Sequence, residues 1–312
     1  MNSVTPHRWD RLQPVRHTTP SPLASKTPNP RMKSVAIIGT GLIGASFGLA
    51  LRKEGFDGPI TGVSSQSAIA AALAVGAIDR GVPLAEAVAQ ADLVFLSQTI
   101  GRILDTLRHL DPLVRPGALV TDAGSTKSEI VDAALEHVSR CQFLGGHPMA
   151  GKEMRGAAAA DPDLFRGRTW VLTPSQPGEL STGAATGFVT WIRRIGAHPV
   201  VMAPAEHDRV VSFTSHLPQM ASTALAATAG ESVPPEGLRV AGSGLLDMTR
   251  LALSSYDLWR DILSTNAGEI DHALGVYIQK LEHMRENLRT RQLQEEFLRG
   301  AATAGRLRGV TR

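Results

Sequence analysis

Hydrophobic and polar positions follow one pattern up to residue 203 and a different one beyond it. Short apolar runs alternate with helical stretches over residues 33–203, which is typical of a parallel sheet covered by helices. The runs that indicate strands are Ser34–Ile38, Ile60–Val63, Ala91–Ser97, Ala118–Asp122, Gln142–Gly145, Thr169–Thr173 and His198–Met202. We therefore predict an α/β domain with a mostly parallel, doubly wound sheet over residues 33–203.

After Pro204 the pattern becomes helical throughout. The predicted helices cover residues 206–229, 236–252, 256–266 and 268–298. The last carries apolar residues at alternating spacings of four and three, as in a heptad repeat: Ile270, Leu274, Tyr277, Leu281, Met284 and Leu288. This stripe either packs on its own domain or forms a dimer interface. We expect an all-α domain over residues 204–312 that joins two copies into a homodimer.

Residues 1–32 have a different composition, rich in proline, serine and threonine, which favours a disordered tail. Residues 1–33 also carry six basic side chains against Asp10 alone, so the net charge of +3 leaves a mildly acidic remainder. A basic tail on an acidic body, with 4% aromatic residues, argues against nucleic-acid binding.

The chain has one cysteine, Cys141, no apolar run long enough to span a membrane, and no signal-peptide core. These features predict a cytoplasmic protein without membrane contact. No spacing of His, Cys, Asp and Glu resembles a metal site, so we expect none.

A glycine-rich turn follows the first strand and opens a helix predicted from Leu42 to Glu54. In this position Gly39 permits the tight turn, Gly41 lets the backbone approach a pyrophosphate, and Gly44 lets helix and strand pack closely. The turn therefore predicts a Rossmann domain that binds a dinucleotide at the helix N-terminus. The residues expected to contact the cofactor here are Gly39, Thr40, Gly41, Leu42, Ile43 and Gly44.

The end of the second strand reads Gly62-Val63-Ser64-Ser65-Gln66 and lacks the acidic residue that usually holds the ribose of NAD. Ser64, Ser65 and Gln66 can donate hydrogen bonds to a 2′-phosphate, but no arginine stands beside them. The sequence therefore predicts NAD or NADP as cofactor.

Four further segments carry polar residues that a purely structural core does not need. They are Gly124–Lys127, Gly145–Gly151, Ser215–Gln219, and Asp247–Arg250 followed by Trp259–Asp261. Their order and amino-acid sequences resemble those of the prephenate and arogenate dehydrogenase family of tyrosine biosynthesis. The resemblance extends from residue 33 to about residue 290. It is strongest in the run Gly-Gly-His-Pro-Met-Ala-Gly, and it implies the monofunctional form of the enzyme.

The resemblance implies that hydride passes from C4 of the substrate to the nicotinamide, with loss of CO2. His147 would be the base that takes the proton of the C4 hydroxyl, from a loop at a strand end. Ser125 would hydrogen-bond that hydroxyl; alternatively Ser125 or Thr126 caps the helix expected near Lys127. Arg250 would anchor a carboxylate, or would pair with Asp247 one helical turn earlier.

The resemblance also implies an ionic network of Glu153, Asp247, Arg250 and Trp259 around the pocket, and a substrate contact from His216. His216 could instead be a buried histidine bonded to the backbone. Gln219 stands where many relatives have a second histidine, and it keeps the choice between prephenate and arogenate open. We favour prephenate. Two alternatives remain: another β-hydroxyacid dehydrogenase of this plan, and a catalytically silent nucleotide sensor.

Overall fold

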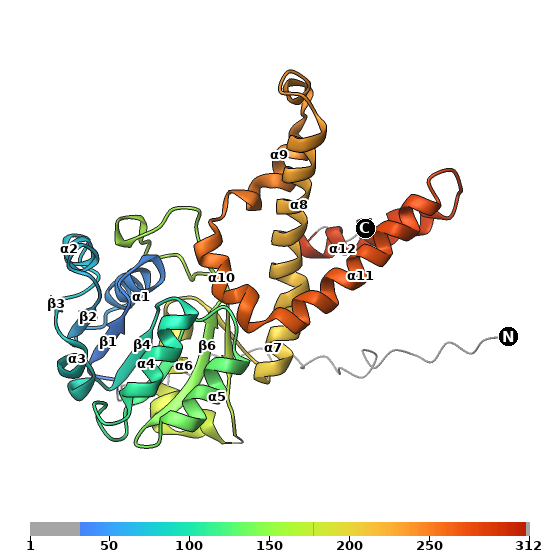
Figure 1. Cartoon of the computed structure of the whole chain (residues 1–312). Helices are drawn as coiled ribbons and strands as arrows, with labels where there is room; N and C mark the ends of the chain where they lie inside the picture. The colour runs from blue at the N-terminus through green and yellow to red at the C-terminus, as the bar shows by residue number, and fades with distance from the viewer. Residues whose placement is uncertain (1–31, 177, 310–312) are drawn as a thin grey trace.

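The computed structural model describes residues 32–176 and 178–309, so the predicted tail lies almost entirely outside the described residues. The predicted fold class is confirmed: a mostly parallel sheet flanked by helices is followed by a helical region (Figure 1). The eight described strands pair in the order β3-β2-β1-β4-β5-β6-β7-β8, and only the β6–β7 pair is antiparallel. The chain order reverses between β1 and β4, which is where open α/β sheets bind ligands.

The strands are β1 (Val35–Ile38), β2 (Ile60–Val63), β3 (Arg80–Gly81), β4 (Leu93–Leu96), β5 (Leu119–Asp122), β6 (Gln142–Pro148), β7 (Thr169–Thr173) and β8 (His198–Val201). The helices among them are α1 (Leu42–Lys53), α2 (Gln66–Ala74), α3 (Leu84–Gln90), α4 (Ile100–Leu110), α5 (Ser128–His137) and α6 (Gly183–Arg194). Each predicted strand is present, and the two-residue β3 was too short to be predicted.

Both faces of the sheet are buried, which explains the continuous apolar runs. Val35 and Ile37 of β1 join one cluster with α1 and α6, whereas Ala36 and Ile38 join a second cluster with α3, α4 and α5. The second cluster also includes Ile262 and Ile270 from the helical region. The helical region therefore shares a core with the sheet.

The helical region begins with α7 (Pro204–Val211), a π turn (Ser212–His216) and α8 (Leu217–Ser232). The predicted single helix 206–229 is thus interrupted. Pro218 has no backbone N–H and cannot continue the regular pattern, and the Leu217 N–H bonds instead to the Ser212 carbonyl five residues earlier. The predicted helix 236–252 is also broken, into α9 (Ser243–Thr249) between two 3-10 turns, Gly237–Val240 and Arg250–Leu253.

The predicted helix 268–298 is wrong as one element. After α10 (Tyr256–Thr265), the chain forms α11 (Ala267–Glu286) and α12 (Leu293–Leu307), joined by a turn. The Asn287 amide donates to the His283 carbonyl at 2.9 Å, and the Thr290 hydroxyl donates to the Asn287 carbonyl. These side chains compete with the helical backbone and end α11.

The apolar stripe of α11 changes its surroundings along the helix. Ile270 is buried, whereas Leu281 is 46% exposed, and Leu288 lies in the turn at 71% exposed. In Figure 1, α11 and α12 form one projection from the sheet, and α8 with α9 forms another. No described helix combines the length and apolar composition needed to cross a membrane.

Candidate active site

The principal cleft lies at the carboxyl ends of the parallel strands and is closed on one side by the helical region. Its volume is about 1080 Å³. The lining residues that the sequence also singled out are Leu42, Ile43, Ser125, His147, Glu153 and Arg250. The cleft therefore brings the glycine turn, the expected base and the expected carboxylate anchor to one place.

The glycine turn has the geometry that its sequence predicted. Gly39 has a φ of 100°, and its N–H bonds to the Val63 carbonyl at 2.8 Å. A Cβ at Gly44 would lie 2.1 Å from the Gly39 oxygen, whereas a Cβ at Gly41 would meet no protein atom within 4 Å. Gly44 is thus needed for packing, and Gly41 faces open space.

The helix that follows the turn offers donors to a ligand. Gly41 precedes α1 without a side-chain cap, and the first turn of α1 contains no acidic residue. Unpaired N–H groups and the positive end of the helix dipole suit a pyrophosphate at this point. Thr40 is fully buried, so its side chain does not face the cleft.

The end of β2 carries no charge. Ser64, Ser65 and Gln66 are exposed, and the Ser65 hydroxyl accepts the Ala68 N–H as the cap of α2. Ser65 therefore has a structural role in helix capping in addition to the predicted contact with the cofactor.

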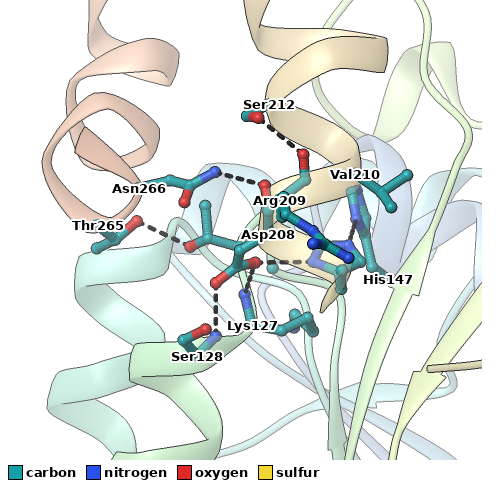
Figure 2. Close-up of polar contacts among 12 residues, drawn as sticks. Lys127, Ser128, His147, Asp208, Arg209, Val210, Ser212, Thr265 and Asn266 are labelled. Atoms are coloured by element: carbon teal, nitrogen blue, oxygen red, sulfur yellow. Dashed lines mark hydrogen bonds and ion pairs between the residues drawn. The ribbon is translucent and has the colours of Figure 1, made fainter. Parts of the chain in front are cut away.

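Ser125 lines the cleft, and its hydroxyl bonds to none of the described residues. Neither Ser125 nor Thr126 caps α5, so the alternative role considered for them is wrong. Thr126 instead bonds to Thr265 at 2.8 Å. The cap comes from Asp208, whose carboxylate accepts the N–H groups of Lys127 at 2.7 Å and Ser128 at 2.8 Å (Figure 2). A tertiary cap makes a local one unnecessary.

His147 lies within β6 and not in a loop, which corrects the sequence prediction. β6 extends beyond β5, and its end, including His147 opposite Val171, pairs antiparallel with β7. Gly145 and Gly146 permit this close pairing, since a Cβ at Gly145 would lie 2.2 Å from the Thr173 hydroxyl. The ring of His147 is thereby fixed on a strand, where it is mostly buried but still lines the cleft.

Two residues that sequence reasoning missed stand behind His147. Nδ1 of His147 lies 2.8 Å from Nε2 of His207, and Nδ1 of His207 lies 2.8 Å from Oδ1 of Asp208. Both side chains belong to α7 and are buried. The adjacent His-Asp pair is the only sequence signal for them, and that signal is weak, because nothing local connects α7 to β6.

A buried ion pair fixes the backbone before His147. Lys127 pairs with Asp122, and its Nζ also donates to the Gly146 carbonyl at 2.9 Å. Asp122 Oδ1 accepts the Gly146 N–H at 3.0 Å. Burial lowers the pKa of Lys127, although Asp122 acts in the opposite direction. Both peptide groups of Gly146 are therefore held.

The surroundings of His147 favour its neutral form. Burial, followed by the nearby His207, Lys127 and His216, holds the pKa of His147 well below 6.5. Nε2 of His147 has no hydrogen-bond partner in the described part of the chain and is not sealed from solvent. This nitrogen is the one available to a ligand. Although several histidines gather here, no group of three metal-binding side chains is arranged to hold an ion among the described residues.

Arg250 begins a 3-10 turn at the mouth of the cleft. It pairs with Glu153 at 3.0 Å and not with Asp247, so the alternative of a pair one helical turn away is wrong. Asp247 is exposed on α9 and forms no ion pair within the described ranges. Of the expected ionic network, only the Arg250–Glu153 pair is formed within one chain.

His216, Gln219 and Trp259 lie beside the cleft without lining it. His216 is buried, its Nδ1 is 3.2 Å from the Asn266 amide nitrogen, and its ring packs edge-on against Trp259. Burial lowers the pKa of His216 to about 4. The Gln219 amide donates to the Leu251 carbonyl at 2.9 Å, so Gln219 holds the turn that carries Arg250.

Comparison with known proteins identifies two matching family regions. Residues 47–186 match the nucleotide-binding domain of prephenate dehydrogenase, and residues 203–302 match its dimerization domain. The prephenate dehydrogenase of Bacillus subtilis is 35% identical over 266 residues, which are 82% of this chain and 70% of the relative.

Solved structures show the same similarity. Prephenate dehydrogenase from Aquifex aeolicus, solved with hydroxyphenyl propionate and NAD+, is 29% identical with a TM-score of 0.79, over 89% of this chain and 97% of that one. Arogenate dehydrogenase from Synechocystis is 31% identical with a TM-score of 0.72, over 89% of this chain and all of that one.

Proposed function

Because the chain belongs to the prephenate dehydrogenase family, we propose that it converts prephenate to 4-hydroxyphenylpyruvate and CO2 and reduces NAD(P)+. The observation that carries this proposal is the single cleft lined by Ser125, His147 and Arg250 beside the glycine turn. A base, a hydroxyl ligand and a carboxylate anchor are what this substrate requires. A nucleotide sensor without catalysis has no use for that combination.

The residues present fit a dinucleotide. The open space at Gly41 and the uncapped start of α1 suit the pyrophosphate, and Leu42 and Ile43 line the cleft next to it. When bound, the nicotinamide accepts the hydride from C4 of the substrate. Ser64, Ser65 and Gln66 add no negative charge at the end of β2, so a 2′-phosphate meets no repulsion there. We propose that the enzyme uses both NAD and NADP.

Three residues of the cleft have separate roles in the proposed reaction. His147 accepts the C4 hydroxyl proton at Nε2, the nitrogen that bonds to none of the described residues. Ser125 hydrogen-bonds the same hydroxyl and orients C4 toward the nicotinamide. Arg250 binds a substrate carboxylate through its guanidinium, which exchanges or shares its pairing with Glu153. The buried Lys127–Asp122 pair keeps the strand that carries His147 in place.

We favour prephenate over arogenate as the main substrate. Prephenate lacks the ammonium group of arogenate and therefore carries more negative charge. Three cations (Lys152, Arg155, Arg250) and three carboxylates (Glu153, Asp257, Asp261) line the cleft. Lys152 and Arg250 are paired with carboxylates, whereas Arg155 forms no ion pair with the described residues, and its positive charge favours the more anionic substrate. Gln219, which kept the choice open, does not line the cleft. We therefore propose that Gln219 acts through the turn that it holds and not by direct contact with the substrate side chain. His216 and Trp259 act beneath the site, and Asp247 lies outside it.

We propose that the boundary between the two domains lies at residue 203. We further propose that the helical domain after it joins two copies of the chain into a homodimer. Apolar side chains exposed on this region support the dimer: Leu246 (65%), Met248 (56%), Leu281 (46%), Phe297 (68%) and Leu298 (63%). Asp247 and the exposed end of the α11 stripe lie on the same region, where a second copy could complete the ionic network.

A steady-state comparison of prephenate and arogenate, each with NAD and NADP, tests the substrate and the cofactor together. We expect the highest kcat/KM with prephenate, coupled to release of CO2, and turnover with either cofactor. Turnover of arogenate alone would reverse the substrate assignment. Absence of decarboxylation would favour another hydroxyacid dehydrogenase.

A further inference from the structure

The side chains of Asp208, His207 and His147 form a chain of hydrogen bonds that ends at the cleft with His147. His207 lies between the other two, 2.8 Å from His147 through Nε2 and 2.8 Å from Asp208 through Nδ1. The ring of His207 is fully buried, so solvent does not reach either nitrogen. Each contact holds one proton, and the protonation of one end therefore decides that of the other.

The Asp208 end of this line can only accept hydrogen bonds. Its carboxylate takes the N–H groups of Lys127 and Ser128 at the N-terminus of α5, where a negative charge is stabilised (Figure 2). Burial acts to raise the pKa of Asp208, but the hydrogen bonds from His207, Ser128 and Lys127 outweigh it, and the pKa lies below its usual value. An ionised Asp208 requires the proton of His207 to be on Nδ1.

The consequence passes along the line. Neutral His207 with its proton on Nδ1 presents a lone pair at Nε2, which accepts a hydrogen bond from Nδ1–H of His147. We propose that His207 and Asp208 are positioning residues that hold His147 in the tautomer whose Nε2 lone pair faces the cleft. This inference rests on the proposed role of His147 as the base.

The same arrangement serves the proton once it has been transferred. The C4 hydroxyl proton moves to Nε2 of His147, which becomes a cation while its Nδ1–H bond to His207 is kept. The Asp208 carboxylate at the far end then stabilises that cation, as the buried aspartate does in a Ser-His-Asp triad. Without the Asp208 carboxylate, protonated His147 would be destabilised by the nearby positive charge of Lys127.

A matched pair of variants tests the inference. His207→Gln places an amide oxygen near the former Nε2 and still accepts from His147, whereas His207→Asn is too short to reach His147 but still donates to Asp208. We expect kcat to fall by roughly 10- to 100-fold in His207→Asn and by less than about threefold in His207→Gln, with little change in the KM for prephenate. Equal kcat values in the two variants would overturn the proposal, because a role in packing alone does not distinguish them.

A second measurement needs neither substrate nor cofactor. Nitrogen-15 NMR of the histidine-labelled enzyme, with His147→Asn for assignment, reports which ring nitrogen of His147 carries the proton. We expect Nδ1–H in the wild type and in His207→Gln, and a mixture in His207→Asn. A wild-type spectrum with the proton on Nε2 would refute the inference even if prephenate is turned over. If the enzyme gave the expected spectra but did not turn over prephenate, the inference would be supported and the proposed function would be refuted.

Discussion

The carboxylate of Asp208 accepts a 2.8 Å hydrogen bond from the backbone N–H of Ser128, eighty residues earlier in the chain. This bond joins the first helix of the helical region to the N-terminus of α5 in the sheet domain. The same carboxylate bonds to His207, which contacts His147. One buried side chain thus connects helix capping, the association of the two regions and the proposed base.

Replacement of Asp208 by asparagine should affect both roles. The amide nitrogen would donate to His207 and reverse its tautomer, so we expect kcat to fall by about 10²–10⁴-fold. Loss of the charged cap should lower the free energy of unfolding by about 0.5–2 kcal/mol. Steady-state kinetics and denaturant unfolding measure the two effects. Asp132→Asn, on the exposed face of α5, is the control and should change neither.

The pH profile should reflect the environment of His147. Because its pKa is held well below 6.5, the residue stays neutral, and kcat/KM should fall only when the pH drops through that lowered value. His147→Asn should reduce kcat by about 10²–10⁴-fold, leave the affinity for the cofactor nearly unchanged and abolish this acid limb. An acid limb centred at or above pH 6.5 in the wild type would contradict the assignment.

Acid should also destabilise the fold through His216. Burial lowers the pKa of His216 from 6.5 to about 4. Between pH 6.5 and pH 4, His216 is therefore protonated in the unfolded chain and neutral in the folded protein. The stability is complete above pH 6.5 and is lost as the pH falls toward 4. Between pH 7 and pH 5, the loss should be roughly 2 kcal/mol. Denaturant titrations of wild type and His216→Gln measure it, and an equal pH dependence in both would rule His216 out.

Two glycines of the turn should respond differently to alanine. Gly41→Ala meets no protein atom, so we expect unchanged thermal stability and about tenfold or greater loss of dinucleotide affinity. Gly44→Ala places a Cβ 2.1 Å from the Gly39 oxygen and should lower stability by about 1–3 kcal/mol. Thermal unfolding and NADH fluorescence titration separate these effects. Normal cofactor binding by folded Gly41→Ala would place the pyrophosphate elsewhere.

Arg250→Ala should raise the KM for prephenate by about 10- to 100-fold with little change in kcat, because a charge-assisted hydrogen bond to the substrate is lost. Arg115→Ala is the control. Arg115 also forms an ion pair at the surface, with Asp92. It precedes β5, so it lies at the amino ends of the strands, away from the cleft at their carboxyl ends. If KM stays unchanged in Arg250→Ala, the pair with Glu153 is purely structural.

Local features of the sequence were sufficient for much of this protein. The apolar runs predicted the strands because a strand buried on both faces favours apolar side chains at most of its positions. The turn at Gly39–Gly44 predicted the proposed dinucleotide site because its backbone geometry depends on a few neighbouring residues. The Gly-Gly-His-Pro run marked His147 by resemblance. Helix ends were less predictable, since Asn287 and Pro218 act through side-chain and backbone bonds that compete with the periodic pattern.

The surroundings of His147 were decided only by the tertiary structure. His147 lies on β6, Lys127 precedes α5, and His207 and Asp208 belong to α7, so no sequence window contains them together. Hydrogen bonds of 2.7–2.8 Å between such elements depend on how the sheet and the helical region pack, and that packing is the sum of many weak apolar contacts. The sequence by itself determined which residue is the proposed base, whereas the tertiary structure decided which of its nitrogens is free to act.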